Sequence, residues 1–97
     1  MRSLLFIALA VLSGCGGADP AAGATVYTAS CASCHAADGT GAVAGAADLT
    51  VRVPAMTDAD LENAVNNGVG TMAPVTLSAA DLADLIAHLR DTFGGGA

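Results

Sequence analysis

The residues of this chain whose types and spacing could do chemistry are Cys31, Cys34 and His35, in the run Cys-Ala-Ser-Cys-His. Two side chains three positions apart lie on one face of a helical turn, so both thiols can reach one flat ligand from the same side. This spacing, followed at once by histidine, is the attachment signature of a c-type haem, whose vinyl groups become thioethers. The imidazole then supplies the proximal iron ligand. We therefore expect one covalent haem c, bound by Cys31 and Cys34 and ligated by His35.

The same cysteine pair has three other interpretations: a redox-active dithiol, half of a zinc site, and chance. A redox dithiol of this spacing is expected in a βαβ context, and a zinc site needs a second pair of ligands. The sequence pattern offers neither of these.

A haem with a proximal histidine also needs a distal ligand, and Met72 is the first candidate. It lies in Gly70-Thr71-Met72-Ala73-Pro74, where glycine and proline favour an irregular backbone able to direct a side chain inward. A thioether sulfur is a soft ligand suited to haem iron. Met56 is the rival, although it directly precedes a helix cap and is placed to act as a hydrophobic staple against Leu61. His88 is a further alternative, and its ordinary role is packing against the first helix.

Three helices, and no convincing strand, must position these residues. The first runs from about Ala21 into the Cys-Ala-Ser-Cys-His run, with Gly23, Tyr27 and Cys31 on one stripe. Residues 36 to about 55, between the first and second helices, form a Gly/Ala/Asp-rich loop that is long for a compact domain. A loop that wraps a prosthetic group accounts for this length.

Both later helices begin with capping-box patterns. Thr57 and Asp60 start the second, which has Leu61, Ala64 and Val65 on its inner face and stops at Asn67-Gly68. Ser78 and Asp81 start the third, whose apolar period ends before Gly94. The apolar residues of this third helix are Leu82, Leu85, Ile86 and Leu89.

The first 14 residues predict export. A positive start is followed by an apolar run from Leu4 to Leu12 that is too short to span a bilayer and is typical of a signal peptide. The sequence Leu12-Ser13-Gly14-Cys15 resembles a bacterial lipobox, and lipidation gives a use to Cys15, which has no disulfide partner; ordinary cleavage that leaves a spare thiol is the alternative. We expect a signal peptide at 1–14, a lipidated tether at 15–22 and a single domain at 23–97. This domain would be attached to a membrane outside the cytoplasm by its acyl chains.

The composition limits what the domain can do unaided. The formal net charge of the full chain is −6, which makes nucleic acid an improbable partner and favours redox partners with basic docking surfaces. Some of the acidic residues lie in the first turns of helices, where the helix dipole favours anions. After cleavage of the expected signal peptide, Tyr27 and Phe93 would be the aromatic residues, and there is no tryptophan. So few large side chains cannot fill a small core, and we expect the chain without haem to be largely unfolded.

From Gly23 to Phe93 the chain resembles the small bacterial class I c-type cytochromes. The likeness rests on glycine and an aromatic ahead of the CxxCH run, on a methionine shortly before proline (Met72, Pro74), and on a C-terminal helix that crosses the first. It implies an all-α fold of three main helices and loops around one covalent haem. The chain departs from the family in having Ala46-Ala47-Asp48-Leu49 where a proline commonly precedes the loop leucine, although a carbonyl remains available to orient His35. It also has His88 where the family usually has tyrosine or tryptophan.

The expected function is single-electron transport in an extracytoplasmic redox chain, because two axial ligands leave the iron no open position. We expect no enzymatic activity and no small-molecule substrate. Two alternatives remain: a haem with a labile sixth ligand that binds peroxide or a gas, and a subunit that works within a larger oxidoreductase. Arg52, from the loop, is expected either to contact a haem propionate or to be simply exposed.

Overall fold

The computed structural model describes residues 17–94 and shows a helical chain. Two long helices and one of intermediate length carry most of the ordered backbone, as expected for an all-α fold of three main helices. Within the described residues, extended pairing is limited to one isolated bridge between Val69 and Met72. The elements are α2 (Pro20–Ser30), α3 (Ala32–His35), α4 (Leu49–Arg52), the 3-10 helix η1 (Val53–Ala55), α5 (Asp58–Asn67) and α6 (Ala79–Phe93).

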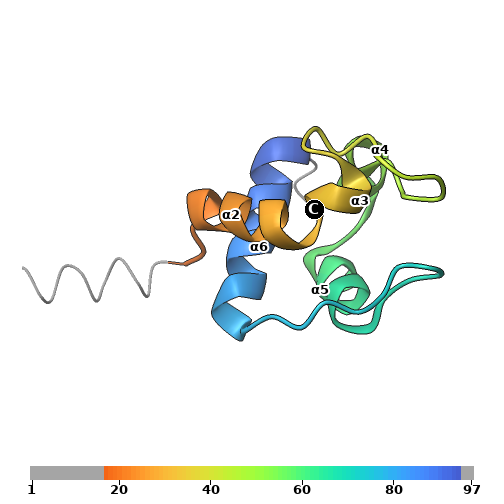
Figure 1. Ribbon diagram of the computed structural model, residues 1–97. Helices are drawn as coiled ribbons and strands as arrows, with labels where there is room; N and C mark the ends of the chain where they lie inside the picture. The colour runs from red at the N-terminus through yellow and green to blue at the C-terminus, as the bar shows by residue number, and fades with distance from the viewer. Residues whose placement is uncertain (1–16, 95–97) are drawn as a thin grey trace, which may run out of the picture.

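The crossing of α2 and α6 forms the centre of the fold (Figure 1). Gly23 lies at the contact, where a Cβ atom would overlap the backbone carbonyl of Asp84 and approach the Cβ of His88 within 2.8 Å. Only glycine lets the two helix backbones approach this closely. The predicted crossing of the first helix by the C-terminal helix is therefore confirmed, and Gly23 lies where they touch.

Helix α2 begins earlier and ends earlier than expected. Asp19 caps it, with a carboxylate that accepts from the Ala21 amide, and Pro20 occupies the first turn. Residues 20–22, expected to belong to a tether, are therefore helical. At the other end the helix stops at Ser30, because Cys31 leaves the helical region with φ −126°. The expected continuous helix is thus two helices, and the break gives α3 its own direction.

The loop expected over residues 36–55 contains regular structure, namely α4 and η1. The carboxylate of Asp48 accepts from both the amide and the hydroxyl of Thr50, at 3.0 and 2.6 Å, and so caps α4. Pro54 lies in the first turn of η1, where a missing N–H costs nothing. The Asp-Leu-Thr signal was present in the sequence, but a helix of four residues is too short to show a period.

The predicted starts of the two later helices are borne out, with one difference. The capping box of Thr57 and Asp60 is complete, with both bonds at 3.1 Å, and Gly68 ends α5 with φ 79°. At the start of α6, Ser78 Oγ accepts from the Asp81 amide at 3.1 Å. The reciprocal bond from the Ser78 amide to the Asp81 carboxylate is not formed in this described segment, so α6 has half a box.

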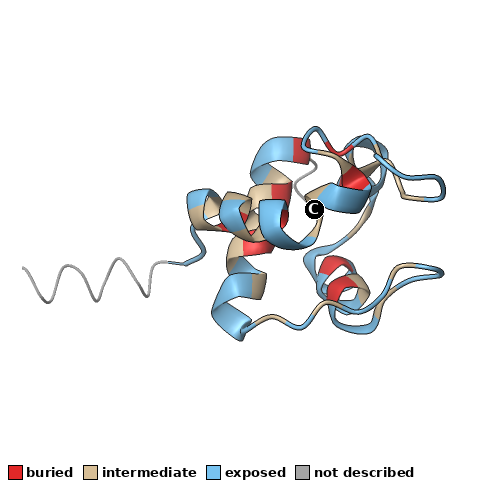
Figure 2. Ribbon diagram, viewed as in Figure 1, coloured by how far each residue is buried: buried red, intermediate tan, exposed pale blue. Residues whose placement is uncertain are grey.

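The buried positions lie on the inward sides of the helices and of the segments between them (Figure 2), and their side chains form one hydrophobic cluster. The buried hydrophobic residues are Tyr27, Val53, Leu61, Val65, Leu85, Ile86, Leu89 and Phe93. Two of them, Val53 and Leu85, are fully buried. Six of these eight also line a cleft, so much of the core faces an open space. In the part of the chain that is described, no helix has the length and apolar character needed to cross a membrane.

Candidate haem site

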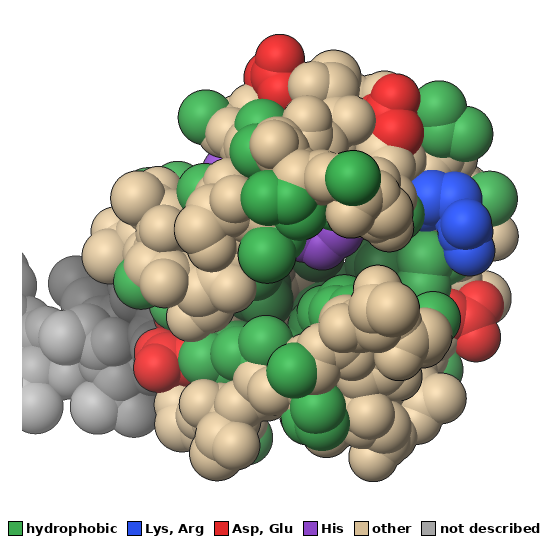
Figure 3. Space-filling model, turned by 45° about the vertical axis from the view of Figure 1, so that its right-hand side comes forward, with side chains coloured by type: hydrophobic (Ala, Val, Ile, Leu, Met, Phe, Trp, Pro, Cys, Tyr) green, Lys and Arg blue, Asp and Glu red, His purple; other side chains and the backbone are tan. Residues whose placement is uncertain are grey.

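An apolar cleft separates the α3 and α4 side of the molecule from α5 and the segment that follows it. Figure 3 shows it as a hollow between two lobes, lined by hydrophobic side chains and with a histidine in its wall. The described residues lining its inner part are Tyr27, Cys31, His35, Ala47, Leu49, Arg52, Val53, Met56, Leu61, Ala64, Val65, Val69, Met72, Leu85 and Leu89. Three of these residues, Cys31, His35 and Met72, also line the outer part of the cleft. Cys34, Val43 and the rest of the segment 71–75 line the outer part as well. The site thus collects residues from every element of the fold.

The cysteine pair lies at the outer part of this cleft. Cys31 is partly buried and Cys34 exposed, and neither forms a disulfide. Burial, together with the charge of Cys34, raises the pKa of the Cys31 thiol from 9.0 to about 11. A redox-active thiol needs a lowered pKa, so the site does not favour the dithiol interpretation. Among residues 17–94, no three or more His, Cys, Asp or Glu side chains form a group that could hold a metal ion such as zinc.

The imidazole of His35 is oriented by a backbone carbonyl. The side chain is only 9% exposed, and its Nδ1 lies 3.0 Å from the oxygen of Ala47. A carbonyl can only accept, so Nδ1 carries the proton and Nε2 keeps its lone pair for a metal. The orienting carbonyl expected within residues 46–49 is therefore present, without the proline that is common in the resembled family.

The backbone directly after His35 adopts an unusual conformation. Ala36 has φ 68° and ψ 161°, a region that alanine rarely occupies. Its carbonyl accepts from the Tyr27 hydroxyl at 2.5 Å and from the Gly39 amide at 3.1 Å.

Burial, and then the charges of Cys31 and Asp38, raise the pKa of Tyr27 to about 12. The hydroxyl therefore stays protonated as a donor at ordinary pH. Nothing in the sequence identified this contact, because no local pattern joins positions 27 and 36.

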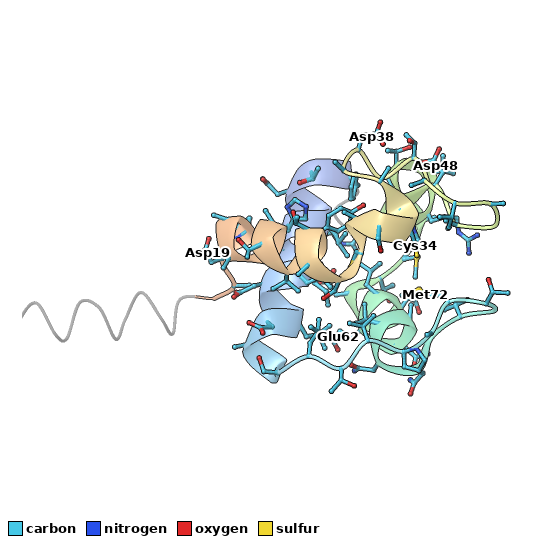
Figure 4. All side chains as sticks on the ribbon, in the orientation of Figure 1. Asp19, Cys34, Asp38, Asp48, Glu62 and Met72 are labelled. Atoms are coloured by element: carbon cyan, nitrogen blue, oxygen red, sulfur yellow. The ribbon has the colours of Figure 1, made fainter. Side chains whose placement is uncertain are left out.

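Met72 lies in a tight turn on the opposite side of the cleft. Its amide donates to the Val69 carbonyl at 2.8 Å, and the Val69 amide donates back at 3.1 Å. Val75 is held to α5 by a bond from its amide to the Val65 carbonyl at 2.8 Å. The half-buried Met72 side chain lines both parts of the cleft, and Figure 4 shows its sulfur and that of Cys34 on facing sides.

The two rival distal residues are placed differently. Met56 is partly buried and lines the inner cleft, so the structure brings both methionines to the site. His88 is absent from the described lining and packs behind it, with its ring centroid 5.2 Å from that of Tyr27 and its Nδ1 3.2 Å from Thr92 Oγ1. The packing role considered for His88 is therefore the one that the structure shows.

The two arginines of the domain lie in contrasting environments. Arg52 is exposed and borders the inner cleft, a position compatible with either of its expected roles. Arg90 is nearly buried and binds Asp58 and two backbone carbonyls. Sequence reasoning gave Arg90 no role, because its partners are more than 30 positions away.

The residues of the cleft fit a haem c. Two thiols at its outer part, an oriented imidazole with a free Nε2, thioether sulfurs and an apolar lining together form the set of groups that a covalently attached, axially ligated haem needs. The small side chains of the domain leave the cleft open, and a large apolar group such as haem would fill it. Cys15 and the predicted signal peptide lie outside the described residues.

Comparison with known proteins supports this assignment. Residues 18–89 match the family described as cytochrome C oxidase, cbb3-type, subunit III. No curated protein and no solved structure matches the chain. The match covers α2 to α5, most of α6, the residues that line the cleft and the Cys-Ala-Ser-Cys-His run. The chain therefore belongs to this family, as a small c-type cytochrome domain that contains haem c and serves haem-based electron transfer.

Proposed function

We propose that this protein is a single-electron carrier, with its haem c attached through Cys31 and Cys34 and ligated by His35 and Met72. The observation that carries the proposal is that both candidate ligands line one apolar cleft, from opposite walls. Haem c supplies reversible one-electron chemistry at its iron. The protein holds the two ligands in place, excludes water from the cleft and presents the site to a redox partner.

The proximal side depends on a fixed imidazole. With Nδ1 bonded to the Ala47 carbonyl, the ring cannot rotate without breaking a partly buried hydrogen bond, so Nε2 is held in one direction. Leu49, whose amide donates to the Gly39 carbonyl at 2.7 Å, fixes the loop that carries this carbonyl. A proximal ligand held in this way changes little between oxidation states.

The distal side depends on the turn that carries Met72. The two bonds between Val69 and Met72 close the turn, and Gly68 permits it, since a Cβ there would overlap the Met72 carbonyl. Because this turn lies across the cleft from His35, Met72 would hold the haem iron from the distal side. A filled second position removes the opening that peroxide or a gas would need.

Absorption spectra test the ligand assignment. The ferric protein should show the weak band at the red edge of the visible that is diagnostic of methionine sulfur on iron, and Met72→Ala should abolish it. Met56→Ala is the matched control, since Met56 lines the same cleft, and it should leave the band in place. Loss of the band in Met56→Ala instead would exchange the two assignments. Avid uptake of carbon monoxide by the reduced wild-type protein would contradict a closed iron.

A second candidate function is favoured by the family description itself. A subunit of an oxidase passes electrons within an assembly, so this domain would serve as a bound relay for a larger oxidoreductase. Co-purification with a multi-subunit enzyme after mild membrane solubilisation supports this relay, and recovery of the protein alone supports a free carrier.

The proposed location is the periplasmic side of a bacterial membrane, with the chain anchored through lipidated Cys15. Domains of this kind are in general extracytoplasmic. The support for the anchor is the lipobox-like sequence before Cys15. Mass spectrometry of the mature N-terminus tests it: a diacylglyceryl group on Cys15 is expected, and Cys15→Ser should release the protein from the membrane.

The proposed partners are redox proteins with basic docking surfaces. Most of the acids are exposed, and none of the described ones lines the cleft, so the negative charge lies on the outer surface of the domain. Long-range attraction would then steer a basic partner, while the largely apolar cleft edge makes the close contact. Electron-transfer rates with the partner should fall as salt rises, and rates that do not depend on salt contradict this steering.

A further inference from the structure

Arg90 joins α6 to a distant segment through hydrogen bonds from its Nη1, Nη2 and Nε atoms. Its Nη1 donates to the Val53 carbonyl at 2.8 Å, its Nη2 to the Met56 carbonyl at 2.5 Å, and its Nε to Asp58 Oδ1 at 2.8 Å. The Arg90 side chain is 16% exposed, whereas that of Asp58 is 64% exposed. The three acceptors all belong to the stretch 53–58.

This stretch forms one wall of the haem cleft. Val53 and Met56 both line it, and Val53 is fully buried. The stretch also connects the two sides of the site, because it follows α4, which begins two residues after the Ala47 carbonyl, and leads into α5. A shift of 53–56 would therefore change the shape of the cleft between the proximal and distal sides.

The bonds that hold the wall need an arginine. The Met56 carbonyl lies at the C-terminal cap of η1, where a helix leaves acceptors without partners inside the helix, and the Val53 carbonyl accepts from Arg90 in addition to the Met56 amide. A planar guanidinium has donors in a fixed fork that can serve two carbonyls and a carboxylate together. A lysine has one compact ammonium group and cannot reproduce this arrangement.

We propose that Arg90 is a positioning residue that fixes the 53–56 wall of the haem cleft and so limits how readily the cleft opens to water and small ligands. The proposal rests on haem c filling the cleft. It does not depend on which methionine is the distal ligand.

Hydrogen exchange of the haem-loaded protein, followed by mass spectrometry, tests the wall directly. Arg90→Lys should speed exchange of the Val53, Ala55 and Met56 amides by about tenfold or more, since bonds to a charged donor are lost. Asp58→Asn keeps the guanidinium on both carbonyls and should change this exchange less than about twofold, because exposed ion pairs contribute little. Unchanged exchange in Arg90→Lys would overturn the proposal.

A second readout separates positioning from general stability. Affinity of the ferric protein for added imidazole should rise about tenfold in Arg90→Lys, matching the easier opening of the wall. The control is Asp84→Ala, which removes the bond from the Asp19 amide to Asp84, at 2.8 Å, away from the cleft. It should lower the unfolding midpoint but leave imidazole affinity within about twofold. Equal effects of the two variants on imidazole affinity would show that Arg90 acts only through stability.

The wild-type protein provides a test even if Arg90→Lys does not fold. The Met56 amide, which donates to the Val53 carbonyl at 3.1 Å, should exchange far more slowly than the amides of the exposed stretch 43–45. Similar rates would mean that no fixed wall exists. Should the proposed axial ligation fail instead, the red-edge band would be missing from the wild type, while the exchange results would be unaffected.

Discussion

At the scale of single residues, the site depends on backbone carbonyls as much as on side chains. His35 is oriented by the Ala47 carbonyl, and the residue after it is held by a bond from Tyr27 to the Ala36 carbonyl. The sequence does not show which backbone carbonyl will act as such an acceptor, because every residue has a carbonyl. The histidine could be predicted from its motif, but the tyrosine contact could not.

Ala36 provides a prediction at this scale. Its φ of 68° with ψ 161° lies in a region open to glycine and costly for alanine, so Ala36→Gly should raise the free energy of unfolding by about 1 kcal/mol. Denaturant unfolding of the haem-loaded protein measures it. Ala29→Gly, on the exposed side of α2, is the control and should lose about 1 kcal/mol. Losses of similar size in both variants would mean that Ala36 is not strained.

Tyr27 provides a second prediction, on pH. Its folded pKa of about 12 lies above the ordinary value of 10.0, so folding favours the neutral phenol. The stability from this preference is complete below pH 10 and is lost as the pH rises from about 10 to about 12. The sequence has no lysine and one tyrosine, so tyrosinate absorbance reports this residue.

Unfolding measured across that range should show the loss in the wild type and a smaller one in Tyr27→Phe, which has no phenol to ionise. Ionisation of folded Tyr27 with a midpoint near 10 would contradict the prediction.

At the scale of elements, the closest contact is that of α2 with α6. Gly23→Ala would gain helix propensity but would force a Cβ into the Asp84 carbonyl, so it should lower the free energy of unfolding by about 3 kcal/mol. Thr25→Ala, on the exposed side of the same helix, is the control and should stay within about 0.5 kcal/mol. Thermal or denaturant unfolding measures both. A neutral Gly23→Ala would show that the helices can separate at little cost.

The elements also show where sequence patterns are reliable. The caps at Thr57 and Ser78 could be predicted because capping is a contact between residues three apart. The break at Cys31 and the short helix α4 could not, since neither is long enough to establish a period. Helix α4 is instead held by its cap and by its place between the proximal loop and η1.

At the scale of the whole molecule, the core is incomplete without its cofactor. Most of the buried hydrophobic residues line the cleft, so removing the haem would leave them facing water. We expect the chain made without haem to lack a cooperative thermal transition in circular dichroism, and the haem-loaded protein to show one. A native-like cooperative melt of the chain without haem would mean that the cleft closes on itself.

The sequence by itself determined the chemistry and the class of fold. The Cys31-Cys34-His35 spacing and the helix caps are local, so the residues that create each signal stand next to one another in the chain. The tertiary structure decided which carbonyl orients His35, which helices touch at Gly23 and what holds the 53–58 segment. These contacts join residues far apart in sequence, and their geometry exists only after the helices pack. That is why Arg90, which has no local pattern, became visible only in the folded chain.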